Sequence, residues 1–284
     1  MSSLLIQNAQ IVTEAQTYLG ACLVKDRLIS ALFDQPFPEQ IQAQSVIDAA
    51  GKYLAPGLID LQLNGAFGYD FTQTPETIWP VAARLPELGL TGFLPTIITS
   101  PLAKSNQAQQ VLKQRPEGFA GTIPLGLHLE GPFLNPLKKG AHNPNHILPA
   151  DEAPAEELAD WSAENGVSLV TLAPEMVGGI PLIKRLVEQG VVVSAGHSMA
   201  TFDEAQEAFD AGISYVTHLF NAMPPLHHHE PGLAAAALAS SFVTIGIIPD
   251  GVHVHPELVG LVWQLAGGRV NGVTDAMGAM GSSP

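Results

Sequence analysis

Four short stretches decide how this sequence is interpreted: HLEGP at 128–132, AGHS at 195–198, THLFNAM at 217–223 and VTDAMGAMG at 273–281. Each follows an apolar run rich in β-branched residues. Each also carries a group that binds metal or moves a proton, namely Glu130, His197, His218 and Asp275. In a closed barrel of parallel strands, functional side chains come from the carboxyl ends of the strands. The four stretches therefore predict a metal-centred active site at one rim of such a barrel.

The chain from Tyr53 onward alternates between strand-like and helix-like segments. The candidate strands are Leu54–Gln62, Gly92–Ile98, Ile123–Glu130, Ser168–Ala173, Val191–His197, Tyr215–Asn221, Val243–Pro249 and Arg269–Asp275. The helix-like stretches include Ala153–Asn165, Pro181–Gln189, Thr201–Ala211 and Pro256–Leu265. Near-continuous apolar strands separated by helices are typical of a parallel sheet that is buried on both faces. Eight such units predict an α/β fold of the TIM-like (β/α)8 barrel type.

The first fifty residues have an all-β pattern instead. Leu4–Val12 and Tyr18–Leu32 are strand-like, and Ser45–Asp48 adds a shorter segment before the barrel pattern begins. We expect a compact sheet here that pairs with strands elsewhere. At the other end the eighth strand stops near Asp275, so we expect a C-terminally truncated chain that lacks the final elements of the barrel.

Composition narrows the function classes. A hydrophobic content of 46% with only 14% charged residues indicates a large buried core, and a net charge of −15 argues against nucleic acid. The opening MSSLLIQNAQIVTE turns polar too soon for a signal peptide. The apolar stretch Leu233–Ile248 is too short for a membrane span, and we interpret it as a helix followed by a buried strand. The lone Cys22 cannot form an internal disulfide, which fits the cytoplasm.

Glu130, His197 and His218 supply one carboxylate and two imidazoles, which suits Zn²⁺ or a similar divalent ion. Three protein ligands leave an open position for water, and bound Zn²⁺ lowers the pKa of water from 15.7 toward about 7. A single histidine at a strand end more often forms only a satisfied hydrogen bond. Three candidate ligands at separate strand ends favour a metal site.

Other polar residues near strand ends are candidates for catalysis or binding. Asp275 could carry a proton from water to a leaving nitrogen, or it could be a helix N-cap. His142, in KKGAHNPNH, could donate a hydrogen bond to a substrate carbonyl and stabilise the oxyanion. His253, in PDGVHVH, is a candidate for substrate contact. Gln62 could orient the bound water or close the barrel rim by hydrogen bonding.

Two amide residues at the end of the first barrel strand indicate how many metal ions the site holds. Gln62 and Asn64 stand where many metal hydrolases with this barrel carry His-x-His and hold a second ion. Amides are weak ligands for Zn²⁺, so one ion is predicted. The triplet His227-His228-His229 is dense in imidazole, but adjacent residues on a loop rarely converge on one ion, so a dedicated second site there is disfavoured.

Taken together, APGLIDLQLNG, LHLEGPFLN, KKGAHNP, AGHSMAT, THLFNAM, EPG, DGVHVHP and VTDAMGAMG resemble the amidohydrolase superfamily and, within it, the N-acetylglucosamine-6-phosphate deacetylases. The resemblance covers essentially the whole chain. It implies hydrolysis of the acetamide of N-acetylglucosamine-6-phosphate to glucosamine-6-phosphate and acetate, in amino-sugar catabolism. It also implies that residues 1–52 are the N-terminal part of a small β-sandwich domain and that residues 53–284 are the hydrolase barrel.

The resemblance further implies one divalent ion per subunit, with Zn²⁺ first and Fe²⁺ or Co²⁺ as alternatives, and a homodimer. From composition and hydropathy we expect a cytoplasmic protein that binds no nucleic acid and no membrane. By motif, Glu130, His197 and His218 resemble the metal ligands. Asp275 resembles the general base and acid, and His142 the histidine that polarises the carbonyl. The residues that resemble substrate contacts, or occupy the position of one, are Ala141, His142, Asn221, Ala222, His229 and His253.

One position departs from the family pattern. The family usually has Arg immediately before Glu-Pro-Gly, donated across a dimer interface to the substrate phosphate, and His229 stands at that place here. Histidine binds phosphate more weakly than the rigid, permanently charged Arg fork. A different N-acetylated amino sugar therefore stays open as the substrate. Because the C-terminal strands of the sandwich are absent from this chain, a non-catalytic remnant stays open as well.

Overall fold

The computed structural model describes residues 2–35 and 41–282, and the chain forms two compact units, Met1–Gly57 and Leu58–Pro284. Among its described residues, the smaller unit contains one five-stranded sheet in the order β3-β2-β1-β4, with β5 also paired to β1. Its strands are β1 (Ser3–Val12), β2 (Thr17–Lys25), β3 (Leu28–Asp34), β4 (Ser45–Asp48) and β5 (Tyr53–Leu54). Leu5, Ala21 and Leu23 form its buried apolar cluster.

The strand predicted over Tyr18–Leu32 is wrong in one respect, because the structure divides it into β2 and β3. Asp26 and Arg27 connect these strands as a two-residue turn, with φ values of 48° and 70°. Two positive φ values are the signature of a type I′ hairpin turn, which Asn-Gly and Asp-Gly favour. Asp-Arg lacks the glycine that would have marked the turn in the sequence.

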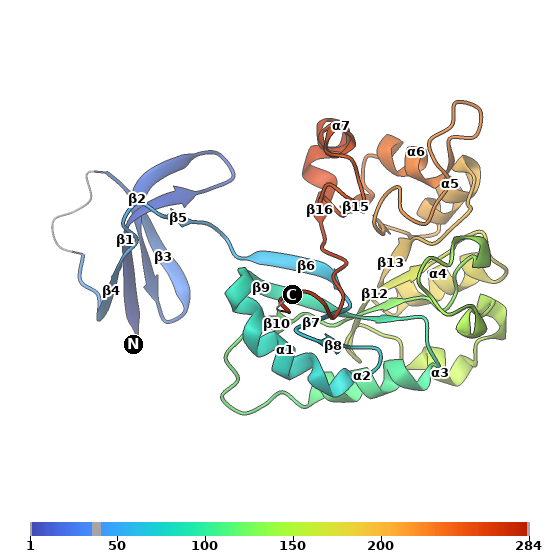
Figure 1. Cartoon of the computed structure of the whole chain (residues 1–284), viewed down its shortest axis with the longest axis horizontal. Helices are drawn as coiled ribbons and strands as arrows, with labels where there is room; N and C mark the ends of the chain where they lie inside the picture. The colour runs from blue at the N-terminus through green and yellow to red at the C-terminus, as the bar shows by residue number, and fades with distance from the viewer. Residues whose placement is uncertain (1, 36–40, 283–284) are drawn as a thin grey trace. The chain divides into compact units, whose positions relative to one another are not determined.

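The larger unit is a nearly closed barrel of eight parallel strands, each of which pairs with the next along the chain (Figure 1). These strands are β6 (Leu58–Leu63), β9 (Leu90–Ile98), β11 (Leu127–Glu130), β12 (Val167–Leu172), β13 (Val192–Ala195), β14 (Tyr215–Val216), β15 (Thr244–Ile247) and β16 (Val270–Gly272). The short β10 (Ile123–Pro124) extends the pairing of β9, and β7 (Gly65–Ala66) pairs with β8 (Tyr69–Asp70). The predicted α/β barrel is therefore confirmed.

Residues just after β16 close the barrel against β6. Leu63 and Ala276 form an isolated parallel bridge, and the Asp275 N–H donates to the Gln62 carbonyl at 3.0 Å. The Asn64 N–H donates to the Ala276 carbonyl at 2.8 Å. This seam brings the last stretch of the chain beside the end of the first barrel strand.

Seven α-helices connect the barrel strands. They are α1 (Ile78–Arg84), α2 (Ala103–Lys113), α3 (Ala155–Ala159), α4 (Gly179–Glu188), α5 (Phe202–Asp210), α6 (Gly232–Ala239) and α7 (Pro256–Ala266). Thr201 and Glu204 form a reciprocal capping box that begins α5, as the sequence T-x-x-E indicates. Among the helices of the described residues, none is long and apolar enough to cross a membrane.

The helix predicted over Ala153–Asn165 is wrong in its length, because α3 ends at Ala159. Beyond it, Gln109 Nε2 donates to the Asp160 carbonyl at 2.8 Å and to the Asn165 carbonyl at 3.3 Å. Trp161 is buried in the core. A buried tryptophan and a glutamine that binds two backbone carbonyls stabilise a turn where the sequence pattern favoured a longer helix.

Candidate metal centre

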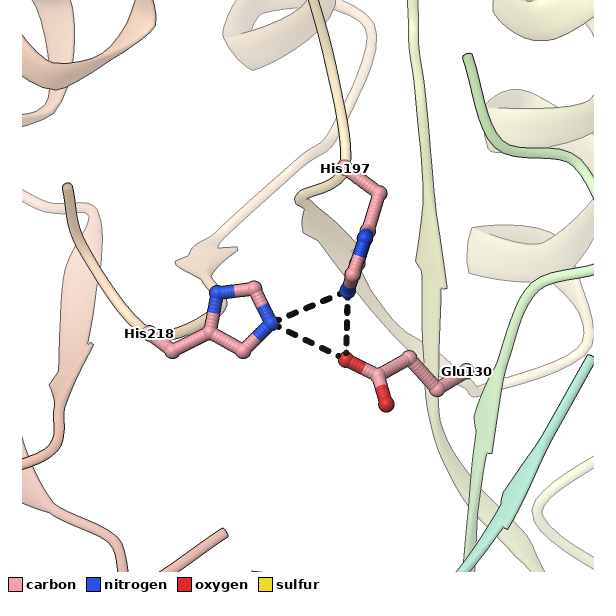
Figure 2. A group of neighbouring side chains, drawn as sticks. All are labelled: Glu130, His197 and His218. Atoms are coloured by element: carbon pink, nitrogen blue, oxygen red, sulfur yellow. Dashed lines mark hydrogen bonds and ion pairs between the residues drawn. The ribbon is translucent and has the colours of Figure 1, made fainter. Parts of the chain in front are cut away.

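Glu130, His197 and His218 converge at the carboxyl ends of three barrel strands (Figure 2). Glu130 is the last residue of β11, His197 lies two residues beyond β13, and His218 lies two residues beyond β14. Glu130 Oε1 lies 3.2 Å from His197 Nε2 and 3.1 Å from His218 Nε2, and the two nitrogens are 3.0 Å apart. Among the described residues, this is the only group of three or more potential ligands that lie so close together.

The three donor atoms fit a divalent metal ion. In a tetrahedral shell with bonds of about 2.0–2.1 Å, the donors lie about 3.3 Å apart, close to the spacing found here. The side chains are only 3–6% exposed, so water does not screen them. His197 Nδ1 lies 2.8 Å from the Lys138 carbonyl and must donate to it, since a carbonyl only accepts. The neutral ring therefore presents the lone pair of Nε2 to the cluster.

Burial and mutual contact shift the pKa values of the cluster. Burial raises the pKa of Glu130, but its contacts with His142, His197 and His218 outweigh burial and hold it well below its usual range. Burial lowers the pKa of His197 despite the nearby carboxylate. Burial also acts to lower the pKa of His218, but the hydrogen bond and charge of Glu130 raise it overall. The carboxylate is therefore ionised and available as a ligand at neutral pH.

Gln62 and His142 both contact the Glu130 carboxylate. Gln62 Nε2 donates to Glu130 Oε1 at 2.9 Å, and His142 Nε2 lies 3.5 Å from Glu130 Oε2. The Thr99 N–H donates to His142 Nδ1 at 3.2 Å, which makes that nitrogen an acceptor. In the neutral ring, His142 Nε2 therefore carries the proton and can donate.

Asp275 lies beyond β16, beside the residues that end β6. Its Oδ1 accepts a hydrogen bond from Asn64 Nδ2 at 2.7 Å. Burial and the charge of Glu130 raise the pKa of Asp275 to about 6, although His218 and Asn64 act to lower it. A carboxyl group that titrates near neutrality can both accept and return a proton.

The remaining candidate residues lie on the loops around this cluster, and among the described residues none of them hydrogen-bonds a ligand atom of Glu130, His197 or His218. The hydrogen bonds of Asn221 to the cluster go only to the His218 backbone carbonyl. Ala141 is exposed beside the buried His142. Asn221 and Ala222 are half-buried, three and four residues after His218. His253 is half-exposed, and its Nδ1 contacts Asp250 Oδ2 at 2.8 Å.

His229 is also on the rim. It is exposed, and its ring lies beside those of His227 and His228. It borders a depression of about 580 Å³ that is also lined by Thr201 and Glu230. Among the described residues it makes no side-chain hydrogen bond to the metal-binding cluster.

The sequence did not identify three buried partners of the site. Asp60 accepts hydrogen bonds from the Thr274 N–H and hydroxyl, at 3.2 and 2.5 Å, next to Asp275. His128, two residues before Glu130, is fully buried, and burial lowers its pKa to about 4, so it is neutral. Thr99 orients His142. Period-two alternation along β6 would have indicated that Asp60 shares a face with Gln62, but no comparable signal marks Thr99.

Comparisons of sequence and of structure find relatives that carry the same name. The chain is 38% identical over 258 residues to an N-acetylglucosamine-6-phosphate deacetylase of Danio rerio, covering 87% of this chain and 64% of that protein. It is 35% identical to the enzyme of that name from Bacillus subtilis (strain 168), covering 98% and 72% of the two chains. A Mycobacterium smegmatis N-acetyl-D-glucosamine-6-phosphate deacetylase mutant, solved with N-acetyl-D-glucosamine-6-phosphate, superposes with a TM-score of 0.87 at 31% identity, covering 100% and 73%. No protein-family model matches the chain.

A parallel barrel that carries a Glu-His-His cluster and a further carboxylate at its strand ends is the arrangement of an amidohydrolase. Within that superfamily, the chain belongs to the N-acetylglucosamine-6-phosphate deacetylase family. It spans 64% of the length of the Danio rerio relative, that is, less than two thirds.

Proposed function

We propose that this chain catalyses metal-dependent hydrolysis of the acetamide of N-acetylglucosamine-6-phosphate, giving glucosamine-6-phosphate and acetate. The observation that carries the proposal is the buried Glu130–His197–His218 cluster with Asp275 beside it. The cluster lies at the carboxyl-terminal end of the barrel strands, where barrel enzymes have their active sites. The names of the relatives support the sugar phosphate as the substrate.

One divalent ion fits the donors of the cluster, and Zn²⁺ suits two imidazoles and a carboxylate best, with Fe²⁺ or Co²⁺ as alternatives. An ion held there would act as a Lewis acid that polarises the amide carbonyl and lowers the pKa of the attacking water. Gln62 donates to the Glu130 carboxylate, and Asn64 donates to Asp275. Both amides therefore act as hydrogen-bond donors, which supports a single ion.

The protein groups move one proton and stabilise one oxygen. Asp275, ionised, removes a proton from the water whose oxygen attacks the acetamide carbon. His142 Nε2–H donates to the carbonyl oxygen as it becomes negatively charged. Asp275 then returns the proton to the sugar nitrogen as the C–N bond breaks, which releases the free amine and acetic acid, and the acid ionises to acetate in solution.

The rim residues would bind the rest of the substrate. We assign Ala141, Asn221, Ala222, His229 and His253 to contacts with the sugar and its phosphate. The charge of −15 leaves little general attraction for an anion, so a phosphate must be bound by local groups. We also propose a homodimer, as the family resemblance implies, and a cytoplasmic location, which the lone Cys22 fits.

A second substrate class is favoured by one observation. His229 is exposed and stands where the family has Arg, and an imidazole binds phosphate more weakly than a guanidinium fork. As a deacetylase of another N-acetylated amino sugar, with or without phosphate, the chain would use the same metal centre. A third alternative is that the chain is a non-catalytic remnant.

Acetate release distinguishes these readings. The chain is loaded with Zn²⁺ or Co²⁺ and assayed with N-acetylglucosamine-6-phosphate, N-acetylglucosamine and their galactosamine counterparts, with a chelated sample as the control. Metal-dependent turnover that favours N-acetylglucosamine-6-phosphate supports the leading proposal. Preference for another sugar supports the second. No turnover by folded, metal-loaded protein would refute both and favour the remnant.

A further inference from the structure

Glu175, three residues beyond β12, joins two loops at the rim of the barrel. Its Oε1 accepts hydrogen bonds from Asn135 Nδ2 at 2.9 Å and from the Met199 backbone N–H at 2.6 Å. Its Oε2 accepts a hydrogen bond from Ser198 Oγ at 2.7 Å. One carboxylate therefore ties the loop that begins at Asn135 to the two residues that follow His197.

The contacts of Glu175 are directional hydrogen bonds and not an ion pair. None of the ion pairs in the part of the chain that the structure describes involves Glu175. Its donors are an amide, a hydroxyl and a backbone N–H, all of them neutral. Hydrogen bonds to a carboxylate are shorter and stronger than those between neutral groups, so this side chain can fix the geometry of both loops.

The loop that begins at Asn135 also holds His197. The Asn135 N–H donates to the His197 carbonyl at 2.9 Å, and His197 Nδ1 donates to the Lys138 carbonyl at 2.8 Å. Asn135 Oδ1 accepts from the Leu137 N–H at 2.9 Å and caps the short 3-10 helix Pro136–Lys138. The same segment therefore fixes both the backbone and the ring of His197.

His197 needs this support because its backbone conformation is unfavourable. Its φ is 49°, in the left-handed region that residues with a Cβ rarely adopt. Such a conformation persists only where the surroundings impose it. Hydrogen bonds on both sides of His197 impose it here, and Glu175 connects the two sides.

We propose that Glu175 is a positioning residue of the metal centre. By joining the two segments that flank His197, its carboxylate keeps His197 Nε2 directed at the other two ligands. The inference rests on the metal-binding part of the proposed function and not on the substrate. Groups that orient a metal ligand from behind change metal affinity by about 10–100-fold when they are removed.

The test measures the affinity of Glu175 variants for Zn²⁺ and Co²⁺, by competition with a chromophoric chelator and with no sugar present. We expect Glu175→Ala to bind each metal about 10–100-fold more weakly than the wild type. Glu175→Gln should lose about 3–10-fold, because the amide oxygen still accepts while the amide nitrogen cannot accept the Ser198 hydroxyl. The visible spectrum of Co²⁺-loaded Glu175→Ala should also change, because the coordination geometry changes.

Glu207→Gln is the matched control, since Glu207 lines the same depression as Glu175, and its replacement removes the same charge. It should keep wild-type affinity. The inference is overturned if folded Glu175→Ala binds metal as tightly as the wild type, or if Glu207→Gln loses as much affinity. If Glu175→Ala does not fold, Glu175→Gln decides by the same criteria. A wild-type chain that binds metal but releases no acetate would contradict only the proposed activity.

Discussion

The inner part of the site, formed by the three clustered residues, differs in burial and in contacts from its rim, formed by the loop residues His229 and His253. Glu130, His197 and His218 are almost fully buried, and their side chains contact one another across three strands. On the rim, the His253 side chain is 50% exposed, and its hydrogen bond among the described residues is to Asp250 in its own loop. His229 is also exposed, among neighbouring histidines.

The difference follows from what holds each part in place. The barrel strands and the hydrogen bonds behind the ligands fix the inner residues, so a change there disturbs several partners at once. The rim residues lie on loops, where substitutions are tolerated and where specificity changes between relatives. We therefore expect the inner part to determine whether the chain reacts and the rim to determine with which sugar.

The largest effect should come from removing an inner ligand. His218→Ala leaves two ligands, so metal affinity should fall by more than about 100-fold and acetate release by about 1,000-fold or more. Metal content after dialysis and the rate of acetate release measure the two effects. His228→Ala, which removes an exposed imidazole from the rim, is the control and should keep both properties. Equal losses in the two variants would remove the distinction between the inner site and the rim.

Asp275→Asn should separate proton transfer from metal binding. The amide keeps the shape of the side chain but cannot accept the proton, so kcat should fall by about 10²–10⁴-fold. Metal affinity should change by less than about tenfold, because Asp275 is not one of the three clustered donors. Asp250→Asn removes a carboxylate from the rim and should cost only a few-fold. Loss of metal from Asp275→Asn would instead make Asp275 a ligand.

The sequence predicted most of the barrel because parallel strands buried on both faces read as continuous apolar runs. All eight predicted strands overlap observed ones. The errors arise where local pattern and tertiary contact conflict. The Asp26-Arg27 turn lacks the glycine that marks such turns, and α3 is cut short by the burial of Trp161.

The sequence also predicted that Glu130, His197 and His218 lie at strand ends, and the structure brings them together there. Their roles as metal ligands stay predictions. It could not reveal contacts that depend on closure of the barrel. Asn64 and Asp275 are 211 residues apart and meet only because the end of the chain returns to β6. The link from Glu175 to the segments around His197 is likewise formed by loops whose conformation no periodic pattern encodes.

A smaller effect is expected on the rim, at His229. His229→Arg supplies a permanent charge and a fork of donors, so kcat/KM for N-acetylglucosamine-6-phosphate should rise by about 3–10-fold. The value for unphosphorylated N-acetylglucosamine should not change. His227→Arg adds the same charge two residues away and controls for general attraction. No gain, or the same gain in the control, would show that position 229 does not contact the phosphate.

The smallest effect is expected from the buried Asn64, which orients Asp275 by a hydrogen bond and, among the described residues, makes none to the Glu130–His197–His218 cluster. Asp275 must be ionised to act as a base, so activity should fall as pH decreases through its pKa. The protein groups raise that pKa to about 6, and a bound cation would act in the opposite direction and lower it.

Asn64 Nδ2–H stabilises the carboxylate form of Asp275, so Asn64→Ala should raise its pKa. The acid midpoint of kcat should then move upward by about 0.5 in pH, with little change at pH 8. Asn145→Ala, on the exposed part of the loop after β11, should leave the midpoint in place. A downward shift, or an equal shift in both variants, would mean that Asp275 does not set the acid limb. The proton would then have to be carried by another inner residue, His142 first among them.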